Sequence, residues 1–186
     1  CLSSVNLEEY DEWKNNDLFI PDLIRMLDNV LDHFIHNAPS ELHRAVYSAR
    51  QERSLGLGAM GFHAYLQRHS IPFESVIAKV RNKNMFREIK EKANEATKIL
   101  AKERGECPDG IGYGVRNSHL LAIAPNASSS IICGNTSPSI EPYRANAFVQ
   151  KTKTGSSLLK NEYLEHCLDE IGMNNEEIWK DIQYNI

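Results

Sequence analysis

The feature that most constrains the fold of this chain is its alternation of amphipathic helical stretches with short apolar runs that have no helical period. Runs of the second kind occupy residues 1–7, 119–125 and 146–155. Short runs of this type, bounded by polar or turn-forming residues, are typical of strands. Strands that alternate with helices predict an α/β arrangement in which short strands are covered by helices.

Helical periodicity is clearest over residues 20–36, where Pro21 and Asp22 suit the first turn of a helix. We expect one face of this helix to be buried. That face carries Leu23, Leu27, Val30, Leu31 and Phe34.

Three further helices are expected in the first 105 residues. One covers residues 39–54 with Ser40 as its N-cap, and another covers residues 58–70. After a break at residues 71–74, a long helix is expected to end at Gly105, because glycine readily adopts the backbone conformation of a helix end. Its inward face carries Phe86, Ile89, Ala93, Ala96 and Leu100.

The second half of the chain contains more loop. Residues 107–118 are expected to be irregular, and residues 126–143 to form a loop with at most one helical turn. A helix is expected over residues 156–172, capped by Ser156 or Ser157, and a last helix is expected to start near Asn175.

Composition limits the class of protein. The 186 residues are 41% apolar and 25% charged, which suits one globular domain or a piece of a larger one. A net charge of −4 does not indicate a nucleic-acid surface, and no apolar run reaches the length of a membrane span. The sequence has four cysteines and no secretory signal, so we expect free thiols in a reducing, cytoplasmic compartment.

Both ends of the sequence look truncated. The chain opens on Cys1, not on Met, and it closes inside an apolar-periodic run with no helix stop signal. We therefore expect residues 1–186 to be part of a single larger domain.

The sequence Gly56-Leu-Gly-Ala-Met-Gly61 has the glycine spacing of a dinucleotide-binding loop. Such a loop needs a strand before the glycines, a helix after them and an acidic residue about 20 positions on. Here a polar, helix-like stretch precedes Gly56, and no second strand follows. We therefore interpret the glycines as sites where another element packs closely against the backbone.

A better candidate for phosphate binding follows the apolar run at residues 119–125. The small residues Asn126, Ala127, Ser128, Ser129 and Ser130 stand where this expected strand ends. Unpaired backbone N–H groups and hydroxyl groups at such a point can hold an anion. The alternative is that Ser128 merely caps a short helix.

Three segments together resemble the large (alpha) subunit of class I ribonucleotide reductase. They are LSSVNL at residues 2–7, RSLGLGAMGFHAYL at residues 53–66 and IAPNASSSIICGNTSPSIEPY at residues 123–143. They occur in the family's order and span most of the chain. The resemblance implies a ten-stranded α/β barrel and a place in the C-terminal part of the catalytic domain.

The resemblance also implies an activity, which is the reduction of ribonucleoside diphosphates to deoxyribonucleoside diphosphates by radical chemistry. In the family, the loop matching Asn126–Ser130 holds the substrate diphosphate with backbone amides and hydroxyls. The segment with GLGAMG is a packed structural part of these proteins. No cofactor or metal is expected in this segment.

The resemblance leaves two alternatives for Cys1. One of the two cysteines that reduce the substrate stands just before the LSS-NL strand in the family, with six steps to the asparagine. Here Cys1 and Asn6 are five steps apart. Either Cys1 is the redox cysteine of a chain with one residue fewer, or that cysteine lies just upstream.

Other parts of the family's machinery have no match in residues 1–186. The thiyl-radical cysteine, the second redox cysteine and the effector-binding regions lie upstream in the family, and a radical-relaying tyrosine pair lies downstream. Tyr143 and Tyr184 are single tyrosines and do not match that pair. We therefore expect this segment alone to be inactive.

The whole enzyme would be an alpha dimer and would need several partners. These are the rest of the alpha subunit, a metal-containing radical-generating small (beta) subunit, a thioredoxin or glutaredoxin type reductant, and ATP or dNTP effectors. Two other hypotheses are a nucleotide-binding module without chemistry and a purely structural piece.

Several residues that could carry chemistry are interpreted as structural. His33, His36 and His43 lack a familiar metal-ligand spacing. Cys107, Cys133 and Cys167 are expected to pack as small apolar residues, although Cys133 follows the serines and could line a pocket. Glu141, which precedes Pro142, is expected to support a turn or a hydrogen bond.

Overall fold

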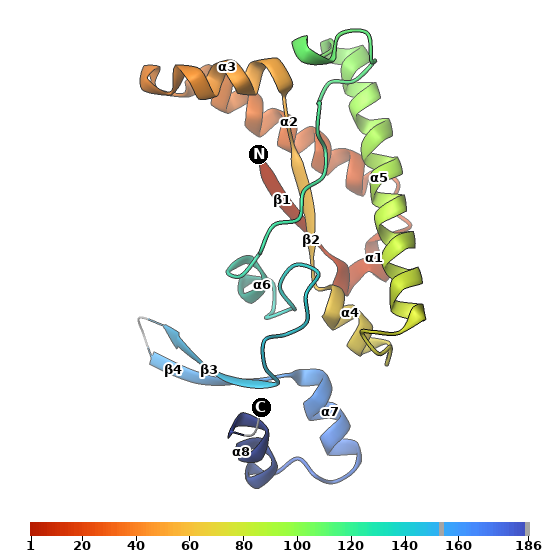
Figure 1. The fold of residues 1–186 in the computed structure, drawn as a ribbon, viewed down its shortest axis with the longest axis vertical. Coiled ribbons are helices and arrows are strands. Elements are labelled where there is room, and N and C mark those ends of the chain that lie inside the picture. The colour runs from red at the N-terminus through yellow and green to blue at the C-terminus, as the bar shows by residue number, and fades with distance from the viewer. Residues whose placement is uncertain (153–154, 185–186) are drawn as a thin grey trace.

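The structure is a computed structural model that describes residues 1–152 and 155–184. The larger part of the structure runs from residue 1 to the end of the long helix α5 at Arg104, and strands alternate with helices there as expected (Figure 1). The elements of this part are β1 (Leu2–Asn6), η1 (Leu7–Glu9), α1 (Tyr10–Trp13), α2 (Phe19–Asn37), η2 (Ser40–Leu42), α3 (His43–Glu52), β2 (Gly56–Met60), α4 (Phe62–Arg68) and α5 (Val76–Arg104).

The remainder is more open. It contains η3 (Pro108–Gly110), the single turn α6 (Ser129–Ile132), the strands β3 (Ala147–Thr152) and β4 (Gly155–Lys160), and the helices α7 (Glu162–Glu170) and α8 (Glu176–Tyr184). Within it, Ala147, Leu168 and Trp179 form a small core of β3, α7 and α8, separate from the main core.

A parallel pair of strands forms the centre of the larger part. β1 pairs with β2 from Leu2–Gly56 to Asn6–Met60, and all five residues of β2 are buried. The expected helix over residues 58–70 therefore begins only at Phe62. Glycine has a weak strand signal, which is why the strand was not predicted.

The glycines of β2 permit the close packing that the sequence indicated, although on a strand instead of a helix. A Cβ atom added to Gly58 would lie 2.5 Å from the carbonyl oxygen of Ala122. Gly61 has a φ of +80°, and a Cβ there would lie 2.3 Å from Oδ1 of Asn6. The buried glycine motif has neither the loop nor the exposed amides that a dinucleotide needs.

The apolar run 119–125 was predicted to be a buried strand, and this prediction is wrong. The run makes one isolated parallel bridge, from Leu121 to Leu57, and its backbone bonds to β2 end at Ala122. Ile123 is 65% exposed. The run therefore lies beside β2 as an extended segment that leaves the strand after Ala122.

Helix α2 confirms the expected helix, but its buried face is shifted. Ile20, Ile24, Leu27, Leu31 and Ile35 are buried, whereas Val30 is 51% exposed. Leu23 and Phe34 lie at the border of the core. The helix carries two overlapping apolar stripes, and the one that also contains Asp28 faces inward.

The predicted cap at the start of α3 is wrong, whereas the predicted end of α5 is confirmed. Ser40 does not cap α3, because it opens the preceding 3-10 turn and Leu42 is the N-cap without a side-chain bond. Helix α5 ends at Gly105 as expected, with a φ of +86°. Its predicted inward residues are buried except Phe86, which lies at the edge of the core.

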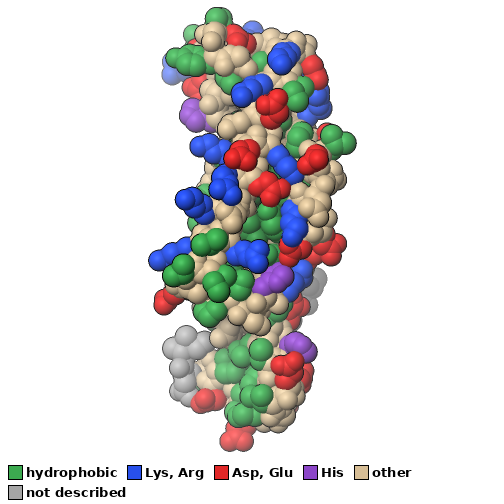
Figure 2. All heavy atoms as spheres, turned by 90° about the vertical axis from the view of Figure 1, so that its right-hand side faces the viewer, with side chains coloured by type: hydrophobic (Ala, Val, Ile, Leu, Met, Phe, Trp, Pro, Cys, Tyr) green, Lys and Arg blue, Asp and Glu red, His purple; other side chains and the backbone are tan. Residues whose placement is uncertain are grey.

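Figure 2 views the molecule from the side on which α5 lies. Charged side chains of both signs are spread over this face, as expected for the solvated side of a helix, and an apolar patch interrupts them. The exposed apolar residues near the start of α5 are Phe73, which precedes the helix, and Val76, Ile77 and Val80 within it.

The helix predicted over residues 156–172 begins later than expected. Its first residues form β4, which pairs with β3 in an antiparallel hairpin. Helix α7 is capped by Asn161, whose Oδ1 accepts from the amides of Tyr163 and Leu164, so neither Ser156 nor Ser157 is the cap. β3 confirms the strand predicted over residues 146–155, of which residues 153–154 lie outside the described residues. α8 starts beside Asn175 as expected.

Candidate functional site

The predicted serine loop, residues 126–130, begins where the extended segment leaves β2. Asn126 has a left-handed backbone (φ 54°), which asparagine tolerates better than most residues. Its amide Nδ2 donates to the carbonyl oxygens of Ala59 (3.1 Å) and Ala124 (3.0 Å), and its Oδ1 accepts from the hydroxyl of Ser4 (3.0 Å). The Asn126 side chain thus ties the loop to β1 and β2.

The last residue of the loop also has a structural role. The amide of Ser130 donates to the carbonyl oxygen of Asn126 (2.9 Å), and its hydroxyl donates to that of Ala127 (3.3 Å). Ser130 is only 3% exposed. Asn126 and Ser130 therefore shape the loop from within.

The middle of the loop is exposed, and its backbone amides and side-chain hydroxyls are unpaired within the described residues. Ala127, Ser128 and Ser129 are exposed. Within the described residues, no group accepts a hydrogen bond from their three backbone amides or bonds to the two hydroxyls. Ser128 occupies the N-cap position of α6, as the capping alternative expects, but its side chain makes no capping bond.

A hollow of about 390 Å³ lies beside the loop. Its walls come from β1, from the end of β2 and from both ends of the loop segment. They are formed by Leu2, Ser3, Ser4, Met60, Ala124, Asn126, Ser129 and Cys133. No sequence pattern marks Ser4 and Met60 as wall residues, because the parallel pairing of strands that are distant in sequence brings them here.

Two cysteines lie at or beside this hollow. Cys133 is exposed and lines it, so the prediction that Cys133 packs as an apolar residue is wrong. Cys1 is exposed and adjoins Leu2 of the wall. Cys107 is buried as expected, and burial raises the pKa of its thiol. Cys167 is exposed on α7, so the prediction that it packs as a small apolar residue is wrong.

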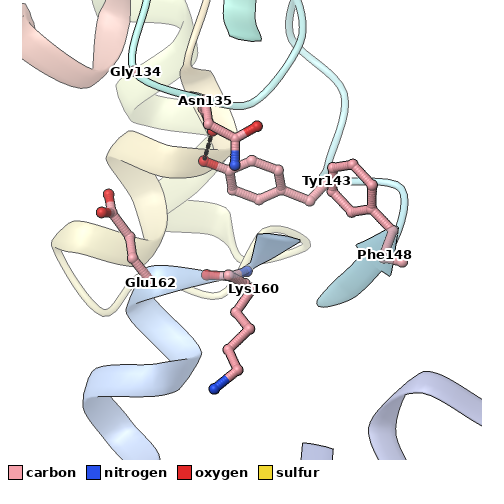
Figure 3. Close-up of a pocket in the computed structure, with 8 residues that line it drawn as sticks. Gly134, Asn135, Tyr143, Phe148, Lys160 and Glu162 are labelled. Atoms are coloured by element: carbon pink, nitrogen blue, oxygen red, sulfur yellow. Dashed lines mark hydrogen bonds between the residues drawn. The ribbon is translucent and has the colours of Figure 1, made fainter. Parts of the chain in front are cut away.

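The serine loop belongs to a longer loop segment, residues 126–135, which ends in a pair of left-handed residues, Gly134 (φ 85°) and Asn135 (φ 62°). The hydroxyl of Tyr143 donates to the carbonyl oxygen of Asn135 (3.2 Å), as Figure 3 shows. The backbone amide of Tyr143 donates to Nδ1 of His63 on α4 (3.2 Å). Sequence analysis did not find Asn135 or this role of Tyr143.

The remaining candidates do not line this hollow. His33, His36 and His43 are exposed, and no group of three metal-ligating side chains occurs in residues 1–152 and 155–184. Glu141 is exposed in a bend, and its side chain forms no hydrogen bond with the rest of the described chain. None of the helices described has both the length and the apolar character of a membrane span.

The sequence profile of the family described as "Ribonucleotide reductase, barrel domain" matches residues 1–110 and 109–186. The chain belongs to this ribonucleotide reductase family. This membership confirms the α/β barrel class that the resemblance implied, and it agrees with a buried, structural GLGAMG strand.

Named members of the ribonucleotide reductase family match over the whole chain. A protein of Frog virus 3 (isolate Goorha), named as a ribonucleoside-diphosphate reductase large subunit, is 53% identical over 188 residues, which cover 100% of this chain and 33% of its own length. The ribonucleoside-diphosphate reductase large subunit of Invertebrate iridescent virus 6 is 49% identical over 187 residues, which cover 100% of this chain and 20% of its own.

A solved ribonucleotide reductase has the same fold. The class Id ribonucleotide reductase alpha subunit of Actinobacillus ureae superposes with a TM-score of 0.89 at 41% identity, covering 100% of this chain and 34% of its own. The chain thus spans about a third or less of the length of these relatives.

Proposed function

We propose that this chain is part of the catalytic barrel domain of a class I ribonucleotide reductase alpha subunit, and that its serine loop holds the diphosphate of the substrate. The reaction is the reduction of ribonucleoside diphosphates to deoxyribonucleoside diphosphates by radical chemistry. Family membership supports the reaction class, since the relatives are named as ribonucleoside-diphosphate reductases.

One observation carries the proposal for the loop. Ala127, Ser128 and Ser129 present three consecutive amides without a partner among the described residues, together with two exposed hydroxyls. Ser129 lines the hollow of about 390 Å³, and Ala127 lines a second hollow of about 450 Å³. Backbone amides and hydroxyls are neutral donors that suit phosphate oxygens. Both hollows fall within the usual size range of small-molecule sites.

The five predicted loop residues divide into two groups. Ala127, Ser128 and Ser129 would contact the phosphates directly. Asn126 and Ser130 would position the contacting residues, because their side chains are engaged within the protein. Fixed phosphates would in turn place the ribose relative to the reacting groups, which lowers the entropic part of the barrier.

Cys1 is the candidate for the redox cysteine. It is an exposed thiol next to the wall of the hollow, which suits a group that must reach both the substrate and a partner cysteine. In this role it would donate electrons to the substrate and close a disulfide with an upstream cysteine. The alternative is that the residue before Cys1 in the complete reductase has this role.

The proposal extends to the partners of the complete enzyme. We infer an alpha dimer that works with a metal-containing, radical-generating beta subunit, a thioredoxin or glutaredoxin type reductant, and ATP or dNTP effectors bound outside this segment. The four free thiols suit a reducing compartment, for which we propose the cytoplasm.

A charge placed among the amides tests the loop proposal. Ala127→Asp adds a carboxylate where the phosphates would lie, while Ala127→Asn adds a neutral group of the same shape; position 127 is exposed, so both should fold. In the reductase chain that contains residues 1–186, the Asp variant should bind ADP at least tenfold more weakly than the Asn variant. Equal affinities would refute the proposal.

A further inference from the structure

Tyr143 lies where three parts of the molecule meet. Its hydroxyl points at the end of the serine loop segment, its backbone amide bonds to α4, and its ring lies beside the β3–β4 hairpin (Figure 3). The ring packs edge-on against His63 with 5.5 Å between centroids. Phe148, Lys160 and Glu162 line the same cavity as Tyr143.

Asn135, whose carbonyl oxygen accepts from Tyr143, has an unfavourable backbone conformation. Asn135 follows Gly134, and both have left-handed backbones. A non-glycine residue in this region is held there by its surroundings, because the conformation is costly. The amide of Asn135 donates back to the carbonyl oxygen of Ile131 (3.2 Å), so the position of Asn135 fixes the last turn of α6.

The hydroxyl of Tyr143 is well placed to supply this restraint. The side chain is half-buried, and burial raises the pKa of the hydroxyl well above its ordinary value. The group therefore remains a hydrogen-bond donor at any pH near neutrality. Its ring contact with His63 and the bond from its backbone amide keep the donor in one place.

The serine loop segment is thus anchored at both ends by asparagines with left-handed backbones. The side chain of Asn126 ties the first end to β1 and β2, and Tyr143 ties the second end through the carbonyl oxygen of Asn135. A single turn between two fixed ends can hold its amides in one orientation before a ligand arrives. If one anchor is lost, the loop must be ordered at the moment of binding, which weakens affinity.

We propose that Tyr143 is a positioning residue for the diphosphate site. Its hydroxyl fixes the carboxyl-terminal end of the loop segment, and thereby the direction of the amides of Ala127, Ser128 and Ser129. This inference rests on the proposed function of the loop. Tyr143 acts through Asn135 and does not contact the substrate.

Tyr143→Phe tests the proposal, because it removes the hydroxyl and keeps the ring. In the reductase chain that contains residues 1–186, KM for CDP should rise about threefold to tenfold, the range expected for one lost neutral hydrogen bond. The kcat should change by less than twofold. Backbone amides of residues 127–133 should exchange hydrogen faster in the absence of nucleotide.

Tyr163→Phe is the matched control. Tyr163 is also half-buried, and its hydroxyl donates to the carboxylate of Glu8 on η1 and not to a residue of the loop segment. This variant should lower stability while leaving KM and the exchange of residues 127–133 unchanged. A general loss of stability would move both variants alike, whereas a positioning role moves only Tyr143→Phe.

Two results would overturn the inference. One is a KM for Tyr143→Phe within twofold of the wild type, with unchanged exchange in the loop. The other is an equal rise of KM in Tyr143→Phe and Tyr163→Phe. The Ala127→Asp measurement separates the function of the loop from the role of Tyr143. If that variant binds ADP more weakly and either of these two results is found, the role of Tyr143 is rejected and the loop function stands.

Discussion

Asn117 and Asp28 lie 89 positions apart in the chain and are joined by a hydrogen bond of 3.0 Å from Nδ2 of Asn117 to Oδ1 of Asp28. Asp28 is 0% exposed and also accepts from Arg53 (2.9 Å) and Arg104 (2.9 Å). Nδ2 of Asn117 donates in addition to the carbonyl oxygen of Arg53 (3.0 Å). This cluster fixes the start of the segment that runs beside β2 to the serine loop.

Removing the charge of Asp28 should destabilise the fold strongly. Asp28→Asn replaces the buried carboxylate beside Arg53 with a neutral amide and leaves the half-buried Asp32 as its charged partner; breaking a buried ion pair typically costs about 3–5 kcal/mol. Denaturant unfolding of the variant measures the loss. Glu95→Gln on the exposed side of α5 is the control and should change the free energy of unfolding by less than about 0.5 kcal/mol.

The same carboxylate predicts how stability depends on pH. Burial acts to raise the pKa of Asp28, but the Arg53 charge and the hydrogen bonds from Arg53 and Asn117 outweigh burial and hold the pKa below its usual range. A depressed carboxyl pKa contributes stability above the unfolded value of about 4, and this contribution is lost as the pH falls toward the folded value. The difference in unfolding free energy between wild type and Asp28→Asn should therefore shrink below about pH 4, and a constant difference would contradict this account.

Gly58→Ala should separate the extended segment from β2. The added Cβ would lie 2.5 Å from the carbonyl oxygen of Ala122, which is backbone and cannot rotate away. Overpacking of this kind costs about 1–3 kcal/mol. Thermal unfolding would show the loss, and Ser48→Thr, which adds a methyl group to the exposed face of α3, should leave the melting temperature nearly unchanged.

Thiol labelling can report on the hollow. Iodoacetamide should alkylate the exposed Cys133 and spare the buried Cys107 in the folded protein. Saturating CDP should slow the labelling of Cys133, because this residue lines the hollow beside Ser129. Cys167 on α7 is an internal control, whose labelling rate should be the same with and without CDP. Equal rates at Cys133 would place the nucleotide elsewhere.

Sequence patterns predicted α2, α5 and the start of α8, because long periodic stretches and end signals are local properties. They did not separate the overlapping apolar stripes of α2, so Val30 was assigned inward although it is exposed. Strand β2 was missed because its glycines carry no strand signal, and β4 because apolar residues there fit a helical period as well.

For the candidate site, the sequence indicated the exposed residues but not the residues that position them. The small residues Ala127, Ser128 and Ser129 were recognised as a possible phosphate site from their composition and position. The inward roles of Asn126 and Ser130 were not, because they depend on contacts with β1, β2 and the loop's own backbone. Tyr143 was missed for the same reason, since its partner Asn135 is identified only by the folded path of the chain.

A structure of the reductase chain that contains residues 1–186, determined with CDP bound, tests the central claim most directly. The account predicts phosphate oxygens within hydrogen-bonding distance of the amides of Ala127, Ser128 and Ser129, with the side chain of Asn126 still bonded to Ala59 and Ser4. Phosphates bound at any other part of the chain, with these three amides facing solvent, would contradict it.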